Sequence, residues 1–357
     1  MRNASLDGDG SLVVDPKYSR WVGDVYLAAE NEIGPEVLSR YSNVVRSVDG
    51  DLSTGIEAEY ANRFGRFLEK EGIPTIILSE GLGVINDYRS ETEESILATI
   101  DPDEGSTNLA SGILPHGVNL TGHYINPSGD TLHKHWITAA IKDRHNNFTY
   151  LAIRGEEGDE VVVIGPDGKE RHPNKKAGTI IEFPIAYILE GDEAAFYTQI
   201  ARYGVVRREF KNNQYRDVSA TGLGVDVVDG AKRMFLEGRG LKKLMGPWNT
   251  TAAGIIVNAG GGKATYADGR SLDDAVIWNE EKWREETGGW NPDHGNELFA
   301  CQSPEDHAKA VMLFEDLRRE GVGVHVIRKL LDAFPYLHSV RAQINEALDT
   351  VDPSIND

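Results

Sequence analysis

The fold of this chain is indicated most clearly by one stretch, Ile100-Asp101-Pro102-Asp103-Glu104-Gly105-Ser106-Thr107-Asn108. An apolar run over residues 95–100 leads into it and predicts a buried strand. Pro102 has no N–H to give to a sheet, so we expect the strand to end there. The hydroxyl and amide side chains at 106–108 are favourable helix N-caps and predict the start of a helix. A strand that ends in carboxylates beside a helix N-terminus suits a divalent cation and a phosphate.

The simpler alternative for this stretch is an acidic turn between a strand and a helix, because short motif matches are common. Two other segments help to choose between an acidic turn and a site for a cation and a phosphate. Residues 73–78 predict a second short buried strand, and Glu80 follows it. Residues 55–70 carry apolar side chains at helical spacing and predict a helix with Glu57 near its start. Two strands that each end in acids beside a helix start are less common than a single acidic turn.

Residues 101–108 resemble the D-P-[IL]-D-G-[TS]-T-N signature of the inositol monophosphatase superfamily. Residues 51–59, Glu80 and residues 247–254 are similar, in the same order, to the family's D-x-x-T-x-x-D, G-E-E and W-D-x-A-A-G motifs. The resemblance extends over about residues 20–320. It implies an α/β fold, a layered α-β-α-β-α sandwich of the inositol monophosphatase and fructose-1,6-bisphosphatase type. It also implies a homodimer and a Mg²⁺-dependent phosphatase of a small phosphorylated metabolite, such as an inositol or sugar phosphate.

The resemblance assigns roles to the acids. Asp101 and Glu80 match metal-binding carboxylates, and Glu80 also matches a glutamate that the family uses in catalysis. Asp103 is expected to offer its backbone carbonyl to a metal. Glu104 stands where the family has its second metal-binding aspartate. Glu57 matches the acid that helps to activate the attacking water.

The resemblance also predicts the groups that bind phosphate. Gly105, Ser106 and Thr107 match the turn that cradles it, and Ser106 replaces a threonine whose hydroxyl takes part in activating water. Lys243, beside Lys242, would receive substrate phosphate in an otherwise acidic protein. The alternative for both lysines is a solvated surface position.

The segment at 247–254 lacks the aspartate of the family's W-D-x-A-A-G motif. Counting from Trp248 places Asn249 at that position, and counting back from residues 252–254 places Thr250 there. Either neutral side chain would contact the second metal or a substrate hydroxyl. The three departures, at Glu57, Glu104 and this position, support two alternative functions. One is a binding or scaffold protein that has lost efficient catalysis, and the other is a changed reaction such as phosphoryl transfer.

Several segments have no counterpart in the motifs. Residues 114–135 read as an insertion, a lid or an oligomer contact, with ligand binding by histidine as the alternative. Its histidines are His116, His123, His133 and His135, of which the last two would share one face of a strand. Residues 16–48 predict two helices or one helix kinked at Gly34-Pro35. Residues 204–208 predict an edge strand, and residues 218–236 predict a helix.

The chain has 357 residues and a formal net charge of −20, which disfavours binding to nucleic acid or to anionic lipid. No apolar run is long enough to span a bilayer. The single cysteine, Cys301, fits a reducing cytoplasm. We expect an N-terminal half at 1–190 that carries the metal site, a C-terminal half at 191–320 and a helical extension at 321–357.

Overall fold

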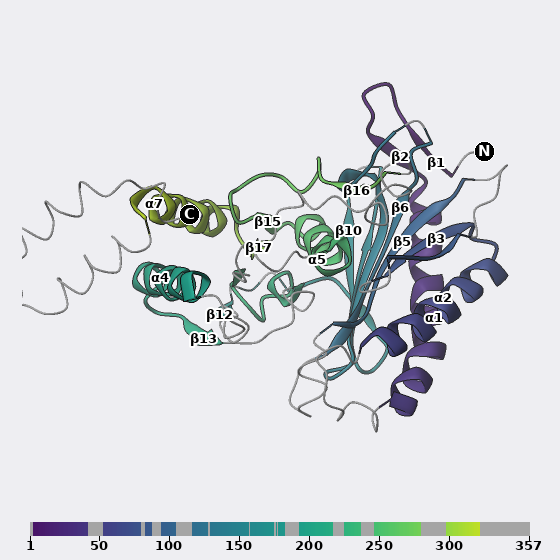
Figure 1. The fold of residues 1–357 in the computed structure, drawn as a ribbon, viewed down its shortest axis with the longest axis horizontal. Helices are drawn as coiled ribbons and strands as arrows, with labels where there is room; N and C mark the ends of the chain where they lie inside the picture. Colours follow the sequence, from purple (N-terminus) through teal and green to yellow (C-terminus); the bar gives the residue numbers. More distant parts are fainter. Residues whose placement is uncertain are drawn as a thin grey trace, which may run out of the picture.

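The computed structural model describes residues 3–41, 53–79, 83–87, 94–104, 116–127, 129–156, 158–174, 176, 178–182, 193–216, 225–236, 246–279 and 298–321. Within these ranges two large sheets and the helices around them form successive layers (Figure 1). None of the described helices combines the length and apolar content that crossing a membrane requires.

The larger sheet has eight strands in the order β11-β10-β9-β8-β6-β5-β3-β4. The neighbours β3 and β5 are parallel, and every other pair in the sheet is antiparallel. Its strands are β3 (Thr75–Ser79), β4 (Gly83–Asp87), β5 (Ile96–Glu104), β6 (Gly117–Tyr124), β8 (Trp136–Asp143), β9 (Phe148–Ile153), β10 (Glu160–Ile164) and β11 (Glu170–Arg171).

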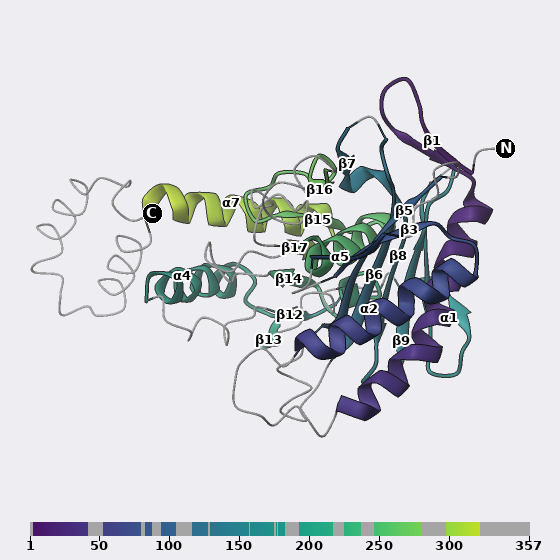
Figure 2. The same ribbon diagram turned by 45° about the vertical axis from the view of Figure 1, so that its right-hand side comes forward.

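Helices α1 (Pro16–Tyr41) and α2 (Ser53–Lys70) cover one face of this sheet (Figures 1 and 2). The helical spacing of apolar residues predicts α2 correctly. Its inward side chains pack against those of α1: the ring centroids of Phe64 and Tyr26 lie 5.2 Å apart. Within α2, the ring centroids of Phe64 and Tyr60 lie 5.9 Å apart. Helix α1 continues without interruption through Pro35, so the two-helix alternative for this segment is wrong.

The second sheet has five strands in the order β13-β12-β14-β17-β15. Helix α5 (Pro247–Ala259) lies between the two sheets, and α4 (Glu193–Glu209) and α7 (Pro304–Glu320) pack on the outer face of the second sheet. The strands are β12 (Ile180–Glu182), β13 (Gln214–Arg216), β14 (Met234–Leu236), β15 (Lys263–Tyr266) and β17 (Leu298–Cys301). The layers follow the order α-β-α-β-α, which confirms the predicted fold class.

The central helix α5 is buried on nearly all sides because a sheet covers each of its faces. Pro247 stands at its first turn, where a missing N–H costs nothing, and the small residues 252–254 let both sheets approach. A Cβ added at Gly254 would lie 2.4 Å from Leu272 Cδ1. The missing side chain at Gly254 thus leaves room for Leu272, in the loop between β15 and β16, to pack against this helix.

Strand β5 does not end at Pro102, contrary to prediction, but runs on to Glu104. Asp101 pairs with Asn119 and Glu104 with Gly117, so three steps along β5 oppose two along β6. This extra residue is a β-bulge, and a bulge tolerates a proline because its N–H is not needed for pairing. The helix predicted from residues 106–108 lies outside the described residues.

The predicted insertion at 114–135 contains a central strand, β6, and is therefore wrong as an insertion. Val118 and Leu120 face the α1 and α2 layer, while Asn119, Thr121 and His123 face the opposite side. Residues 133–135 form the 3₁₀ turn η1 (His133–His135), not a strand. The turn follows β7 (Thr131–Leu132), which pairs with β16 (Val276–Trp278); the N-terminal strands β1 (Ala4–Leu6) and β2 (Leu12–Val14) form a separate hairpin.

Two further predictions are wrong. Residues 204–208, read as an edge strand, are the last turns of α4, where Val205 and Val206 pack into the core against α7. Burial against a neighbouring layer outweighs the low helix propensity of valine. The described part of the helix predicted at 218–236 is instead a 3₁₀ turn followed by β14. The predicted division of the chain at residue 190 stays a prediction.

Phe64 provides a test of the first helix layer. Because its ring is fully buried between α1 and α2, we expect Phe64→Ala to lower the free energy of unfolding by about 3–5 kcal/mol. Urea denaturation measures this change. The control is Met312→Ala on the exposed side of α7, which should change stability by less than about 0.5 kcal/mol. Equal effects of the two variants would contradict the packing described here.

His123 provides a test of the buried polar side of β6. Burial, and then the positive charges that His133, His135 and Arg154 can carry, hold the pKa of His123 well below its usual 6.5. As the pH falls below about 6.5, the unfolded chain binds a proton that the folded protein does not, so the free energy of unfolding decreases. We expect His123→Gln to flatten this pH dependence between pH 6.5 and 5, measured by urea denaturation. An unchanged slope would contradict it.

Candidate active site

The acidic end of β5 is the centre of the candidate site. Asp101 and Asp103 are both buried, with 2 % and 7 % of their surfaces exposed. The Asp103 amide donates to Asp101 Oδ1 at 3.0 Å, which fixes the turn of the backbone between them. The bulge therefore brings two carboxylates of one strand to its end.

The first turn of α5 meets this strand end. Asn249 Nδ2 donates to Asp101 Oδ2 at 3.1 Å, although 148 residues separate the two in the chain. Asn119, the cross-strand neighbour of Asp101, donates through Nδ2 to the carbonyl of Trp248 at 3.4 Å. Thr250 is buried in the same turn. The motif segments that contain Asp101 and Asn249 are thus joined by a direct hydrogen bond. The positive end of the α5 dipole points toward the Asp101 carboxylate.

Strand β3 ends beside the same point. It runs parallel to β5, and its last residue, Ser79, pairs with Ile100, one residue before Asp101. The buried Ser79 hydroxyl has no hydrogen-bond partner within the part of the chain that the structure describes. Glu57, also buried, stands in α2, which packs against β3 and β5. The motif segment that contains Glu57 therefore contributes a buried acid to the helix layer that covers these strands.

The other predicted site residues lie outside the described residues. These are Glu80, Gly105, Ser106, Thr107 and Lys243. Glu104 is described as the last residue of β5, but its side chain is not. Their roles stay predictions.

The described side chains suit a hard cation as one part of its ligand set. Carboxylate and amide oxygens are the donors that Mg²⁺ prefers, and Asp101, Asp103 and Asn249 supply these groups. Within the described ranges, no three His, Cys, Asp or Glu side chains form a metal-holding group by themselves. A complete ligand set would therefore need acids that stand next to this strand end in the sequence, such as Glu80 and Glu104.

Arg144, in the turn between β8 and β9, also belongs to this region and has no counterpart among the sequence predictions. Its guanidinium is buried and donates from Nη1 to the carbonyl of Pro102 at 2.6 Å. Nε and Nη2 each donate at 2.9 Å to a different oxygen of Glu30. The sequence signal for this pair was Glu30 itself, because it lies on the inward stripe of α1 one turn after Tyr26, where an acid needs a partner.

Burial lowers the pKa of Arg144, but Glu30, its hydrogen bonds, Tyr60 and Asp103 together raise the pKa above its usual value. The guanidinium is therefore a permanent positive charge in this part of the core. Asp103, one of the two acids of the bulge, lies close enough to contribute to that effect.

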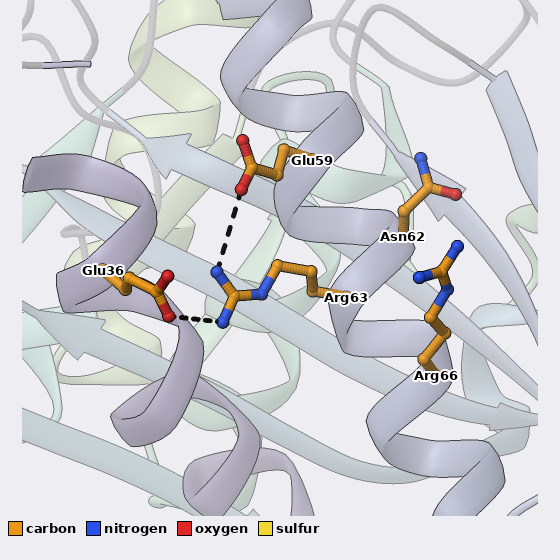
Figure 3. A pocket seen from close by; sticks show the side chains of 5 residues that line it. All are labelled: Glu36, Glu59, Asn62, Arg63 and Arg66. Carbon is orange, nitrogen blue, oxygen red and sulfur yellow. Dashed lines mark hydrogen bonds and ion pairs between the residues drawn. The ribbon is translucent and has the colours of Figure 1, made fainter. Parts of the chain in front are cut away.

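A hollow lies between α1 and α2 in the described part of the chain (Figure 3). It is lined by Glu36, Glu59, Asn62, Arg63 and Arg66. Arg63 Nη2 donates to Glu36 Oε2 at 2.6 Å, and its Nη1 lies 3.8 Å from Glu59 Oε1. Acids of both helices thus compensate the charge of Arg63. Of the lining residues only Glu59 belongs to a segment that resembles a motif, and its carboxylate lies beside Arg63, so we do not assign the activity to this hollow.

Comparison with known proteins gives a match in structure but not in sequence. No protein-family model matches the chain, and no curated protein matches it either. Among solved structures, fructose-1,6-bisphosphatase from Leishmania major superposes with a TM-score of 0.62 and 12 % identity, over 85 % of this chain and 96 % of that one. The extragenic suppressor protein suhB from Bartonella henselae gives 0.55 and 16 %, over 82 % and 98 %.

Inositol monophosphatase from Anabaena gives a TM-score of 0.53 at 15 % identity, over 83 % of this chain and 96 % of that one. These matches extend over nearly the full length of each solved chain, so they include both sheets and the helix between them. At such low identity the similarity is one of fold. The chain therefore has the fold of these solved structures, an inositol monophosphatase and a fructose-1,6-bisphosphatase among them, as its motifs predict.

Proposed function

We propose that this protein is a Mg²⁺-dependent phosphoric monoester hydrolase that acts on a small phosphorylated metabolite, an inositol phosphate or a sugar phosphate. The observation that carries the proposal is the hydrogen bond from Asn249 to Asp101, which joins two motif segments at the end of β5. The fold supports it, since solved structures of that fold include an inositol monophosphatase and a fructose-1,6-bisphosphatase. Cytoplasmic location and a homodimer remain predictions from the sequence.

The carboxylates of Asp101, Glu80 and Glu104 and the backbone carbonyl of Asp103 would hold Mg²⁺, and Asn249 orients the Asp101 carboxylate. When bound, Mg²⁺ would polarise a phosphate oxygen and lower the pKa of a bound water. Glu57, a buried carboxylate in the helix layer that covers β3 and β5, would accept the proton of the attacking water.

The remaining predicted groups act on the phosphate. Backbone N–H groups of residues 105–107 and the hydroxyl of Ser106 would stabilise the equatorial oxygens during in-line attack. Asn249 is neutral where the family has an aspartate, so the second metal position carries less negative charge. That position would therefore fill only when the substrate phosphate completes it.

A catalytically degenerate binding protein is the second candidate, and phosphoryl transfer in the same pocket is a third. The amide at Asn249 favours both, because it removes one charged ligand from the site. Phosphate release from a panel of inositol phosphates, sugar phosphates and adenosine bisphosphates, with and without Mg²⁺, separates the hydrolase from the other two. Turnover that requires Mg²⁺ and is lost in Glu104→Gln supports the hydrolase. Mg²⁺ binding without phosphate release supports the binding protein or the transferase.

Asp101→Asn tests the centre of the site. The substitution keeps the shape of the side chain but removes its charge, so we expect kcat/KM for the best substrate to fall at least about 100-fold. We also expect the rise in Tm on adding Mg²⁺ to disappear, because the carboxylate that attracts the cation is gone. Steady-state phosphate release and thermal denaturation measure the two effects.

The matched control is Asp316→Asn, on the exposed side of α7. It removes the same charge from the chain but should leave both kcat/KM and the Mg²⁺-dependent shift in Tm unchanged. Full activity of Asp101→Asn, or an equal loss in Asp316→Asn, would show that the end of β5 is not the metal site.

A further inference from the structure

Arg144 donates hydrogen bonds to two backbone carbonyls in addition to its ion pair with Glu30. Its Nη1 group donates to the carbonyl of Pro102 at 2.6 Å and to the carbonyl of Gly117 at 3.3 Å. Pro102 lies between Asp101 and Asp103, and Gly117 is the cross-strand partner of Glu104. One guanidinium thus spans both sides of the bulge that carries the proposed metal ligands.

The guanidinium is itself held in a fixed orientation. Both oxygens of Glu30 accept from it in a bidentate pair, and the Tyr60 hydroxyl donates to Glu30 Oε2 at 2.6 Å. Glu30 and Arg144 have 1 % and 7 % of their side-chain surfaces exposed. Gly34 leaves space for the carboxylate, since a Cβ there would lie 2.6 Å from Glu30 Oε1. Helices α1 and α2 therefore set the direction in which Arg144 points.

A bulge with a proline has fewer backbone hydrogen bonds than a regular strand, because Pro102 has no N–H and the pairing with β6 shifts. Its carbonyl needs a donor from elsewhere, and Arg144 supplies one. The same group places a positive charge near Asp103. Both effects stabilise a strand end on which two carboxylates are crowded together.

We propose that Arg144 is a positioning residue for the metal centre: held by Glu30 and Tyr60, it fixes the Pro102 carbonyl and so holds the Asp101 carboxylate and the Asp103 carbonyl in their binding geometry. This inference rests on the proposed Mg²⁺ site. Groups that orient metal ligands from behind typically affect metal affinity by 10–100-fold when they are removed. Lysine cannot replace Arg144, because an ammonium lacks the planar fork that reaches Glu30 and Pro102 together.

The experiment compares Arg144→Met and Arg144→Lys with the intact protein. Isothermal titration calorimetry measures Mg²⁺ affinity at a temperature where circular dichroism shows each variant folded. We expect both variants to bind Mg²⁺ about 10–100-fold more weakly. We expect Tyr60→Phe, which removes one hydrogen bond to Glu30 and keeps both charges, to weaken binding in the same direction but less. Tyr60→Phe keeps the test decisive if Arg144→Met does not fold.

The matched control is Lys232→Met in the second sheet. Lys232 is another buried cation, 8 % exposed, and it pairs with Glu182 and with Asp226 Oδ2 at 3.4 Å. Its replacement should lower Tm as the Arg144 variants do but leave Mg²⁺ affinity unchanged. Wild-type affinity in folded Arg144 variants, or an equal loss of affinity in Lys232→Met, would overturn the proposal.

A second measurement does not depend on the metal. Hydrogen exchange of a peptide from β5, followed by mass spectrometry, reports how firmly the strand end is held. We expect Arg144→Met to increase exchange at 101–104 more than at 96–100, and unchanged exchange at 101–104 would overturn the positioning role. An intact protein that binds no Mg²⁺ would overturn the proposed function, while the exchange result would still decide whether Arg144 holds the bulge.

Discussion

The buried ion pair between Glu30 and Arg144 is the constraint on which the geometry of the candidate site depends. A guanidinium removed from water must find an acceptor for its donors, and here the acceptors come from α1, β5 and β6. These elements must therefore meet at one point. Such a pair adds little net stability compared with apolar packing, but loss of either partner leaves a buried charge without compensation. Its main effect is on arrangement, since the two helices and the β5 bulge can pack in few other ways.

The second constraint is the placement of α5 between two sheets. Its small residues and Gly254 allow close approach on both sides, and this approach brings the first turn of the helix to Asp101. On the same side of the sheet, Asn119, Thr121 and His123 form a polar row along β6, with the Thr99 hydroxyl 2.5 Å from that of Thr121. The site thus continues into a buried polar strip, while the opposite face of the strands is apolar.

The sequence predicts much of this arrangement because each motif is local. Apolar spacing predicts α2, and the run before Asp101 predicts β5. The errors arise where tertiary packing opposes local preference. Valines at 205 and 206 suggest a strand, but they are buried as part of α4 against α7. Pro102 suggests a strand end, but the bulge and Arg144 accommodate it. The histidine-rich segment 114–135 suggests an insertion or a ligand site, but its neighbours on both sides make part of it the central strand β6.

By itself the sequence predicted the fold class, through motifs that resemble a known family, and the segments of the candidate site, because short runs of acids, glycines and apolar residues are local features of the chain. Only the tertiary structure decided which side chains meet. It shows Asn249, and not Thr250, donating to Asp101, and it pairs Glu30 with Arg144 across 114 residues of chain. Contacts of this kind depend on how layers pack and on how buried charges are paired, and neither can be read from residues that are adjacent in the chain.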